Sequence, residues 1–269
     1  SDYISVNLVN YVFDGPNLHN GMECLVALYG YAIVIYCDFS GYSDVAIGIS
    51  KWMGITIPPN FMSPYQSKSV SEFWRRWHIS LSSWLRDYLY ISLGGNRKGK
   101  FRTNLNLFLT MFIGGFWHGA SWNFIIWGAL HGIGLGLNKL WNSLFGKIKF
   151  LPSFLSNGIY ALITFHFVCF CWIFFKASNL DTAIQFIHQI VYQFTFDGAY
   201  EYFENYKLVI IMIVIGYLIH LIPDSFPERV IERQKCFPLV YYVIVMMGFI
   251  ALYSFFKSAE PVMPIYLQF

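Results

Sequence analysis

The feature that most constrains this chain is an apolar stretch, Leu105 to Leu137, with a histidine, His118, near its middle. The stretch contains no Asp, Glu, Lys or Arg and is longer than the about 20 residues that cross a bilayer as one helix. Gly114-Gly115 and Gly119-Ala120-Ser121 lie on either side of the histidine, so we expect a membrane segment that is broken twice. An ionisable side chain at that depth indicates a functional site.

The composition predicts the class of fold. Of the 269 residues, 56% are hydrophobic and 12% are charged, and the mean hydropathy is +0.47. The continuous apolar runs favour helices, because the strands of a membrane barrel alternate apolar and polar residues. We therefore predict an all-α, polytopic integral membrane protein, a multi-helix bundle with short re-entrant and interfacial amphipathic helices. Residues 1–269 are expected to form a single membrane domain.

Further spans are predicted at residues 154–175, 208–222 and 239–256. A shorter apolar stretch at residues 24–36 ends in the polar sequence DFSGYSD, residues 38–44, where we expect either a helix-breaking turn or the polar wall of a buried site. Basic residues gather between residues 68 and 102, and the positive-inside tendency places part of that segment in the cytoplasm. The net charge of +3 is small and indicates no nucleic-acid partner.

Residues 67–91 have the pattern of an amphipathic helix. Ser69 or Ser71 can cap it, and its aromatic and leucine side chains fall on one side. These side chains are Phe73, Trp74, Trp77, Leu81, Trp84, Leu85 and Tyr88. We expect this helix to lie at the membrane interface or at the mouth of a site, with His78 at the border of the aromatic side. The basic turn that follows, residues 94–100, lacks the spacing of a nucleotide-binding loop.

The histidine spacings exclude several kinds of site. The sequence has no HExxH or HxxxH pair and no GxSxG motif, so we expect neither a metal centre nor a serine hydrolase. A buried His118 is suited to be a general base that deprotonates a hydroxyl; the alternative is a core histidine bonded to a backbone carbonyl. His131 is 13 residues further, about 220° around an unbroken helix. We expect it to face away from His118 and to be structural, beside the closely packing glycines Gly128, Gly132 and Gly136.

Five motifs, which span about residues 36–137, resemble one family. They are DFSGYSD at 38–44, FWRRWHISLS at 73–82, WLRDY at 84–88, LGGNR at 93–97 and GFWHG at 115–119. In this order they resemble the membrane-bound O-acyltransferases, and within them the bacterial branch that includes alginate O-acetyltransferase and the D-alanyl transferase of teichoic acids. The resemblance implies a multi-helix fold with a tunnel, an acyl thioester that arrives from the cytoplasm and a hydroxyl acceptor that arrives from outside. It also implies that His118 is the family's near-invariant histidine and His78 its second histidine.

We therefore predict a membrane O-acyltransferase of the bacterial inner membrane that moves an acyl group, foremost acetyl, towards hydroxyls of an exported or cell-surface polysaccharide. His118 and His78 are the predicted catalytic residues. The predicted substrate-binding residues are Trp117, Trp122, Arg86, Asp87 and Asn104. No bound cofactor is expected, because the donor, acetyl-CoA or an acyl carrier protein, is a substrate. Membrane lipid, the polysaccharide acceptor and a periplasmic or extracellular acyltransferase are the expected partners.

Two other functions fit the same residues. In a transporter or channel component, His118 would relay protons and the glycines would allow helix movement. In a non-catalytic scaffold, the chain would hold a periplasmic enzyme that performs the final transfer. The chain begins at Ser1, and members of the branch are longer, so we expect it to be the motif-bearing C-terminal part of a longer protein. Its five cysteines form no CxxC pair and are predicted to be packing residues.

Overall fold

The computed structural model describes residues 1–145, 152–223, 225–234 and 237–256, and within these ranges its elements are all helical. The prediction of an all-α membrane protein is confirmed. The N-terminal elements are α1 (Asp2–Ile4), η1 (Ser5–Val9), α2 (Asn10–Asp14), η2 (Pro16–Leu18) and α3 (Gly21–Trp52). The elements of the middle segment are η3 (Pro64–Gln66), α4 (Val70–Arg76), α5 (Ile79–Trp84), η4 (Leu85–Tyr90), α6 (Gly99–His118) and α7 (Trp122–Phe145). The last elements are α8 (Ser153–Lys176), α9 (Leu180–Tyr192), α10 (Ala199–Asn205), α11 (Lys207–His220), α12 (Ser225–Gln234) and α13 (Leu239–Phe256).

Among the described residues, three helices are long and apolar enough to cross a membrane: α3, α8 and α13. The predicted spans 154–175 and 239–256 coincide with α8 and α13. The predicted span 208–222 coincides with α11, whose 14 residues extend only about 21 Å, short of the about 30 Å of a bilayer core. Helices α10 and α11 meet at an 82° bend, and together they would make a fourth, broken span.

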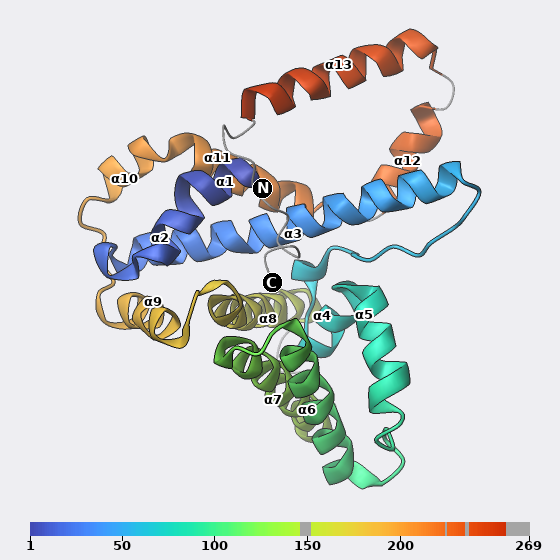
Figure 1. Ribbon diagram of the computed structural model, residues 1–269, viewed down its shortest axis with the longest axis vertical. Coiled ribbons are helices and arrows are strands. Elements are labelled where there is room, and N and C mark those ends of the chain that lie inside the picture. Colours follow the sequence, from blue (N-terminus) through green and yellow to red (C-terminus); the bar gives the residue numbers. More distant parts are fainter. Residues whose placement is uncertain (146–151, 224, 235–236, 257–269) are drawn as a thin grey trace.

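The long helix α3 crosses the molecule and continues through the DFSGYSD sequence without a break (Figure 1). Our expectation of a helix-breaking turn there was wrong. A capping box fixes the start of the helix, since the Glu23 backbone N–H donates to Asn20 Oδ1 at 3.0 Å and the Asn20 N–H donates to Glu23 Oε2 at 3.3 Å. Gly41 and Gly48 each lower the stability of a helix by only about 1 kcal/mol, which is too little to break a hydrogen-bonded helix of 32 residues.

Helices α6 and α7 lie side by side, with α8 next to them (Figure 1). Glycine permits the close contact: a Cβ on Gly115 would lie 2.3 Å from the Phe124 carbonyl oxygen, and one on Gly128 would lie 2.5 Å from the Met111 carbonyl oxygen. The predicted close packing is confirmed for Gly128 and for Gly132, where a Cβ would lie 2.9 Å from the Phe108 Cα, whereas Gly136 has no atom within 4 Å of its Cβ position. Of the two expected breaks beside His118, the chain breaks at residues 119–121 but continues helically through Gly114-Gly115.

The amphipathic helix expected at residues 67–91 is not one helix. It is interrupted between α4 and α5 at His78, whose φ of 44° is left-handed. The extended segment before α4 causes this break, since the Ile79 N–H donates to the Asn60 carbonyl at 3.0 Å and the Met62 N–H donates to the Arg76 carbonyl at 3.0 Å. The N-terminal part of the aromatic side is therefore buried in the protein core rather than placed at the headgroups.

Four cysteines lie in the described part of the chain and are free thiols. Cys24, Cys169 and Cys171 are buried, as a packing role requires, whereas Cys37 is exposed. The fifth, Cys236, lies outside the described residues.

Candidate active site

His118 is the last residue of α6 and is buried, with 8% of its surface exposed. Three aromatic rings surround its imidazole in edge-to-face contacts. The ring centroids lie 5.0 Å away for Trp117, 5.1 Å for Trp127 and 5.2 Å for Phe175. These rings come from α6, α7 and α8, so the orientation of the imidazole depends on how the three helices pack.

His78 lies at the α4–α5 break, where an asparagine holds it. Asn60 Oδ1 accepts hydrogen bonds from the backbone N–H and the hydroxyl of Ser80, both at 3.0 Å, and lies 3.3 Å from His78 Nδ1. Because an amide oxygen can only accept, this contact places the proton of a neutral His78 on Nδ1 and makes Nε2 the accepting nitrogen. Asn60 thus fixes both the backbone turn and the tautomer of His78.

His78 and His118 lie near enough to interact electrostatically, although they are 40 positions apart in the sequence. Burial, with a smaller contribution from the nearby His118, lowers the pKa of His78 to about 4. His78 is therefore neutral at physiological pH. A neutral imidazole can accept a proton or a hydrogen bond, as catalysis of hydroxyl chemistry requires.

We expect the protein to lose stability as the pH falls from 6.5 to about 4. In this window the unfolded chain binds a proton at His78, whereas the folded chain does not. The contribution of His78 to the free energy of unfolding is therefore complete above pH 6.5 and declines below it. Thermal unfolding in detergent across this range measures the decline. The variant His78→Gln should show a shallower decline than the parent chain, and an unchanged slope would contradict the assignment.

A groove of about 510 Å³ opens beside His78 and beside Trp117, the residue before His118. Its lining residues are His78, Ser80, Leu81, Trp84, Leu85, Tyr88, Leu89, Ile113 and Trp117. The walls are mainly apolar and aromatic, with His78 and Ser80 as the polar groups. This arrangement suits a small acyl group held next to a base.

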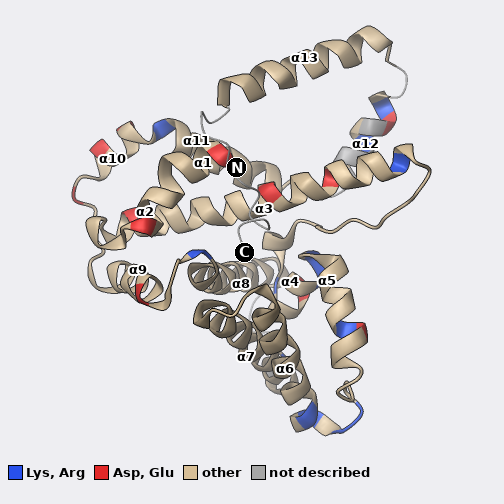
Figure 2. Ribbon diagram, in the orientation of Figure 1, with Lys and Arg blue, Asp and Glu red and all other residues tan. Residues whose placement is uncertain are grey.

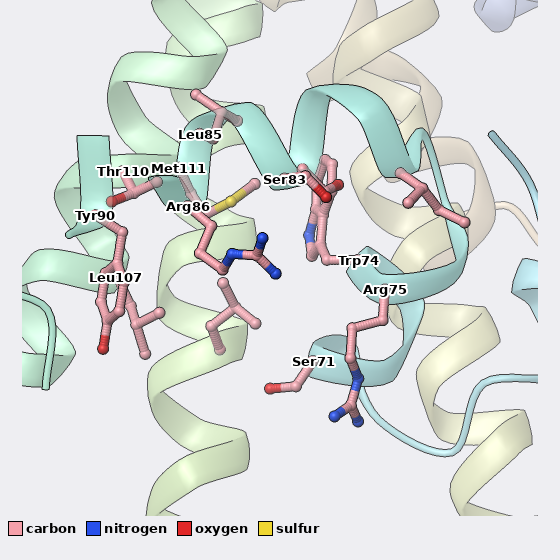
Figure 3. Close-up of a pocket in the computed structure, with 13 residues that line it drawn as sticks. Ser71, Trp74, Arg75, Ser83, Leu85, Arg86, Tyr90, Leu107, Thr110 and Met111 are labelled. Carbon is pink, nitrogen blue, oxygen red and sulfur yellow. The ribbon is translucent and has the colours of Figure 1, made fainter. Parts of the chain in front are cut away.

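Two more cavities follow in the direction of the basic turn. One of about 490 Å³ shares Leu85 with the groove and is also lined by Arg75, Arg86 and Trp74 (Figure 3). The other, of about 270 Å³, shares Arg86 and Tyr90 with it and is lined by residues 94–97 of the basic turn. The three cavities thus surround α5 and η4: the groove lies on the face that carries Leu81, Trp84 and Tyr88, and the other two lie on the face that carries Arg86 and Tyr90.

Three of the predicted substrate-binding residues lie in or beside these cavities. Trp117 lines the groove, and Arg86 lines the two outer cavities. Asp87 is the ion-pair partner of Arg86: Arg86 Nε donates to Asp87 Oδ1 at 2.7 Å and Arg86 Nη2 donates to Oδ2 at 3.0 Å. These hydrogen bonds lower the pKa of the Asp87 carboxyl. Asp87 thus orients the guanidinium at the point where the outer cavities meet.

The other two predicted substrate-binding residues line none of the three cavities described above. Trp122 begins α7 after the break and is 69% exposed, because the regular helix that would put it on the face of His118 does not exist. Asn104 lies 14 residues before His118 on the same helix, about 21 Å along its axis. Its neighbour Asn106 is fully buried and donates from Nδ2 to the Gly95 carbonyl at 2.9 Å, which ties the basic turn to α6.

Sequence reasoning missed three residues that shape the site: Asn60, Trp127 and Phe175. Trp127 could have been found, because it shares a face with Asn123 and His131 at intervals of four residues on a helix that starts at Trp122. Asn123 Nδ2 donates to the Ala177 carbonyl at 2.7 Å and joins this face to the end of α8 beside Phe175. The positions of Asn60 and Phe175 depend on tertiary packing, for which the sequence carries no local signal.

The placement of His131 corrects another expectation. The break at residues 119–121 turns α7 back along α6, so the 220° argument does not apply. The His131 ring lies 4.9 Å from that of Trp127, and Trp127 in turn packs against His118. His131 is therefore linked to the site through one side chain.

The fold and the site together define a polytopic membrane protein with two neighbouring histidines, one of which lines an apolar groove. The chain belongs to the membrane-bound O-acyltransferase family, whose characteristic sequence matches residues 18–180. The match includes the predicted motif region at residues 36–137 and extends beyond it on both sides.

Curated relatives agree with this family. The chain is 42% identical over 188 residues to a peptidoglycan O-acetyltransferase of Helicobacter pylori, which covers 70% of this chain and 35% of that protein. It is 52% identical over 176 residues to a probable alginate O-acetylase of Pseudomonas putida, with coverages of 65% and 35%. It is 38% identical over 164 residues to a teichoic acid D-alanyltransferase of Bacillus subtilis, with coverages of 57% and 41%. The matched part thus spans between about a third and two fifths of each relative.

Proposed function

We propose that the protein is a membrane O-acyltransferase in which His118 is the general base. Its imidazole takes the proton of an acceptor hydroxyl, and the oxygen attacks the carbonyl carbon of an acyl thioester. The tetrahedral intermediate then collapses, the C–S bond breaks, and the thiolate leaves with the proton that His118 had taken. The observation that carries this proposal is that the buried His118 lies near His78, which lines an apolar groove large enough for an acyl group.

In this proposal His78 assists the same proton transfer. Its Nδ1 is directed to Asn60, so Nε2 is the nitrogen that accepts, and the ring is held by a strained backbone at φ 44°. A second neutral imidazole next to His118 can orient the acceptor hydroxyl or share its proton. Strain of this kind persists where surrounding contacts enforce it, here through Asn60 and Ser80.

The charge distribution supports an acyl donor that arrives from the cytoplasmic side of a bacterial inner membrane. Lys and Arg residues gather in the turn before α6 and in the first turn of that helix, at the lower end of the view in Figure 2. They are Arg97, Lys98, Lys100 and Arg102. By the positive-inside tendency this end faces the cytoplasm. Acetyl-CoA and acyl carrier proteins both carry phosphate, which the arginines of the outer cavities can bind.

The acceptor is proposed from the relatives. Their names specify peptidoglycan, alginate and teichoic acid, three polymers rich in hydroxyl groups. The two relatives with the higher identity are named as an O-acetyltransferase and an O-acetylase. We therefore propose that the transferred acyl group is acetyl and that the acceptor is an exported or cell-surface polysaccharide. A periplasmic or extracellular acyltransferase is the proposed partner that completes the transfer.

Feeding membranes that contain the protein with acetyl-labelled acetyl-CoA tests this function. We expect loss of the thioester and appearance of label in ester linkage on a hydroxyl acceptor supplied on the outer side. Proton flux without incorporation of label would overturn the proposal in favour of a transporter or channel. Loss of the thioester only after a separate catalytic partner is added would overturn it in favour of a scaffold.

A further inference from the structure

His131 lies in the interior of the protein with 0% exposure, enclosed by aromatic rings from three helices. The Phe73 ring is stacked on it at 6.1 Å and an interplanar angle of 9°. The rings of Trp74, Trp127 and Phe167 meet it edge to face, with centroids at 5.1, 4.9 and 5.7 Å. Such an enclosure fixes the plane of the imidazole.

A hydrogen bond also fixes its tautomer. Trp74 Nε1 donates to His131 Nδ1 at 3.2 Å, and an indole nitrogen can only donate. Nδ1 is therefore the accepting nitrogen, and the proton of the neutral ring is on Nε2. In the described part of the chain, His131 Nε2 and Trp127 Nε1 are both buried without a hydrogen-bond partner.

These two donors are costly to bury, and an apolar side chain would avoid that cost. A leucine or phenylalanine here would remove the unpaired Nε2, but it would leave Trp74 Nε1 without its acceptor. A histidine in a fixed tautomer at this point indicates a task other than filling space.

The task follows from what the ring touches. Trp127 is one turn before His131 on α7, and its ring lies between the two imidazoles, 4.9 Å from His131 and 5.1 Å from His118. The planes of Trp127 and His118 are nearly perpendicular, at 88°. The Trp127 ring is therefore one of the contacts that can orient the imidazole of His118.

We propose that His131 is a positioning residue that holds the His118 imidazole in its reactive orientation through Trp127. This inference rests on the proposed role of His118 as the base. Trp74 fixes His131, His131 fixes the indole of Trp127, and the indole forms one wall against which His118 is oriented. A base that is turned away from the hydroxyl loses rate even when substrate binding is unchanged, because reactive geometry is needed only during the chemical step.

The test uses variants that separate the hydrogen bond from the ring contact. His131→Asn keeps an acceptor for Trp74 Nε1 but removes the ring against Trp127, and Trp127→Leu removes the indole itself. We expect each variant to lower kcat on the order of tenfold to hundredfold with KM for acetyl-CoA unchanged. The double variant should be no slower than the worse single variant, because both changes break the same chain of contacts.

The matched control is Phe186→Leu. The Phe186 side chain is fully buried, with 0% exposure, and its ring stacks on that of Phe13 with the centroids 4.2 Å apart. It should lower thermal stability as much as His131→Asn while leaving kcat at the parent value. Equal losses of kcat in the control and in His131→Asn would overturn the proposal, as would additive losses in the double variant.

A second readout does not depend on activity. NMR of the protein labelled with ¹⁵N-histidine, without substrate, should show His131 protonated on Nε2. It should also show a shift of the His118 signal, identified by its loss in His118→Gln, when His131→Asn or Trp127→Leu is introduced. If the parent chain transfers no acyl group, the proposed function fails while this measurement still decides the positioning role; an unmoved His118 signal overturns that role.

Discussion

Replacing His118 with alanine is expected to abolish acyl transfer while the protein still accumulates in the membrane. General-base catalysis contributes about 10²- to 10⁴-fold to a rate, and a residual rate that low is lost in the background of a membrane assay. The fold should tolerate the change, because His118 is the last residue of α6 and its neighbours pack on one another, with Trp127 and Phe175 in contact at 5.3 Å. Release of labelled acetyl from acetyl-CoA measures the effect.

Two variants separate the chemistry from the packing. His118→Gln fills more of the space than alanine but cannot act as a base near neutral pH, so it should be equally inactive. His188→Gln, at an exposed position on α9, should transfer acetyl groups at the parent rate. Activity retained in His118→Gln would show that the imidazole serves structure alone and that the base lies elsewhere.

The parts of the fold that could be predicted from the sequence are those that local hydrophobicity decides. The spans at α8 and α13 were predicted to within a residue or two, because an apolar run of that length has no other stable environment. The polar DFSGYSD sequence misled the prediction because α3 continues beyond its buried N-terminal half, and exposed polar side chains do not break a helix.

The site was predictable where its residues belong to motifs. The pair His78 and His118 was named from two separate motifs, and the structure brings them together. The walls of the site were not predictable, because Asn60 comes from an irregular segment and Phe175 from a distant helix. His131 was set aside by an argument that assumed a straight helix, and the break of three residues at 119–121 removes that assumption.

The second large effect is expected at the contact between α6 and α7, where Gly128→Leu should prevent folding. A Cβ at Gly128 would lie 2.5 Å from the Met111 carbonyl oxygen and 3.0 Å from the Gly115 Cα. Both atoms are backbone, so no side-chain rotation relieves the clash and the two helices must separate. Even Gly128→Ala should cost on the order of 1–3 kcal/mol, the usual range for overpacking, although alanine is normally the better helix former.

Gly136 is the matched control, because it lies two turns further along the same helix and nothing lies within 4 Å of its Cβ position. Gly136→Ala should raise stability by up to about 1 kcal/mol, and Gly136→Leu should fold. The sign of the alanine effect is thus opposite at the two glycines, which thermal unfolding in detergent measures directly. Separation of α6 from α7 also moves His118 away from Trp127, so Gly128→Ala should lose more activity than its loss of folded protein explains. Equal stability of Gly128→Ala and Gly136→Ala would contradict the close contact from which the geometry of the site follows.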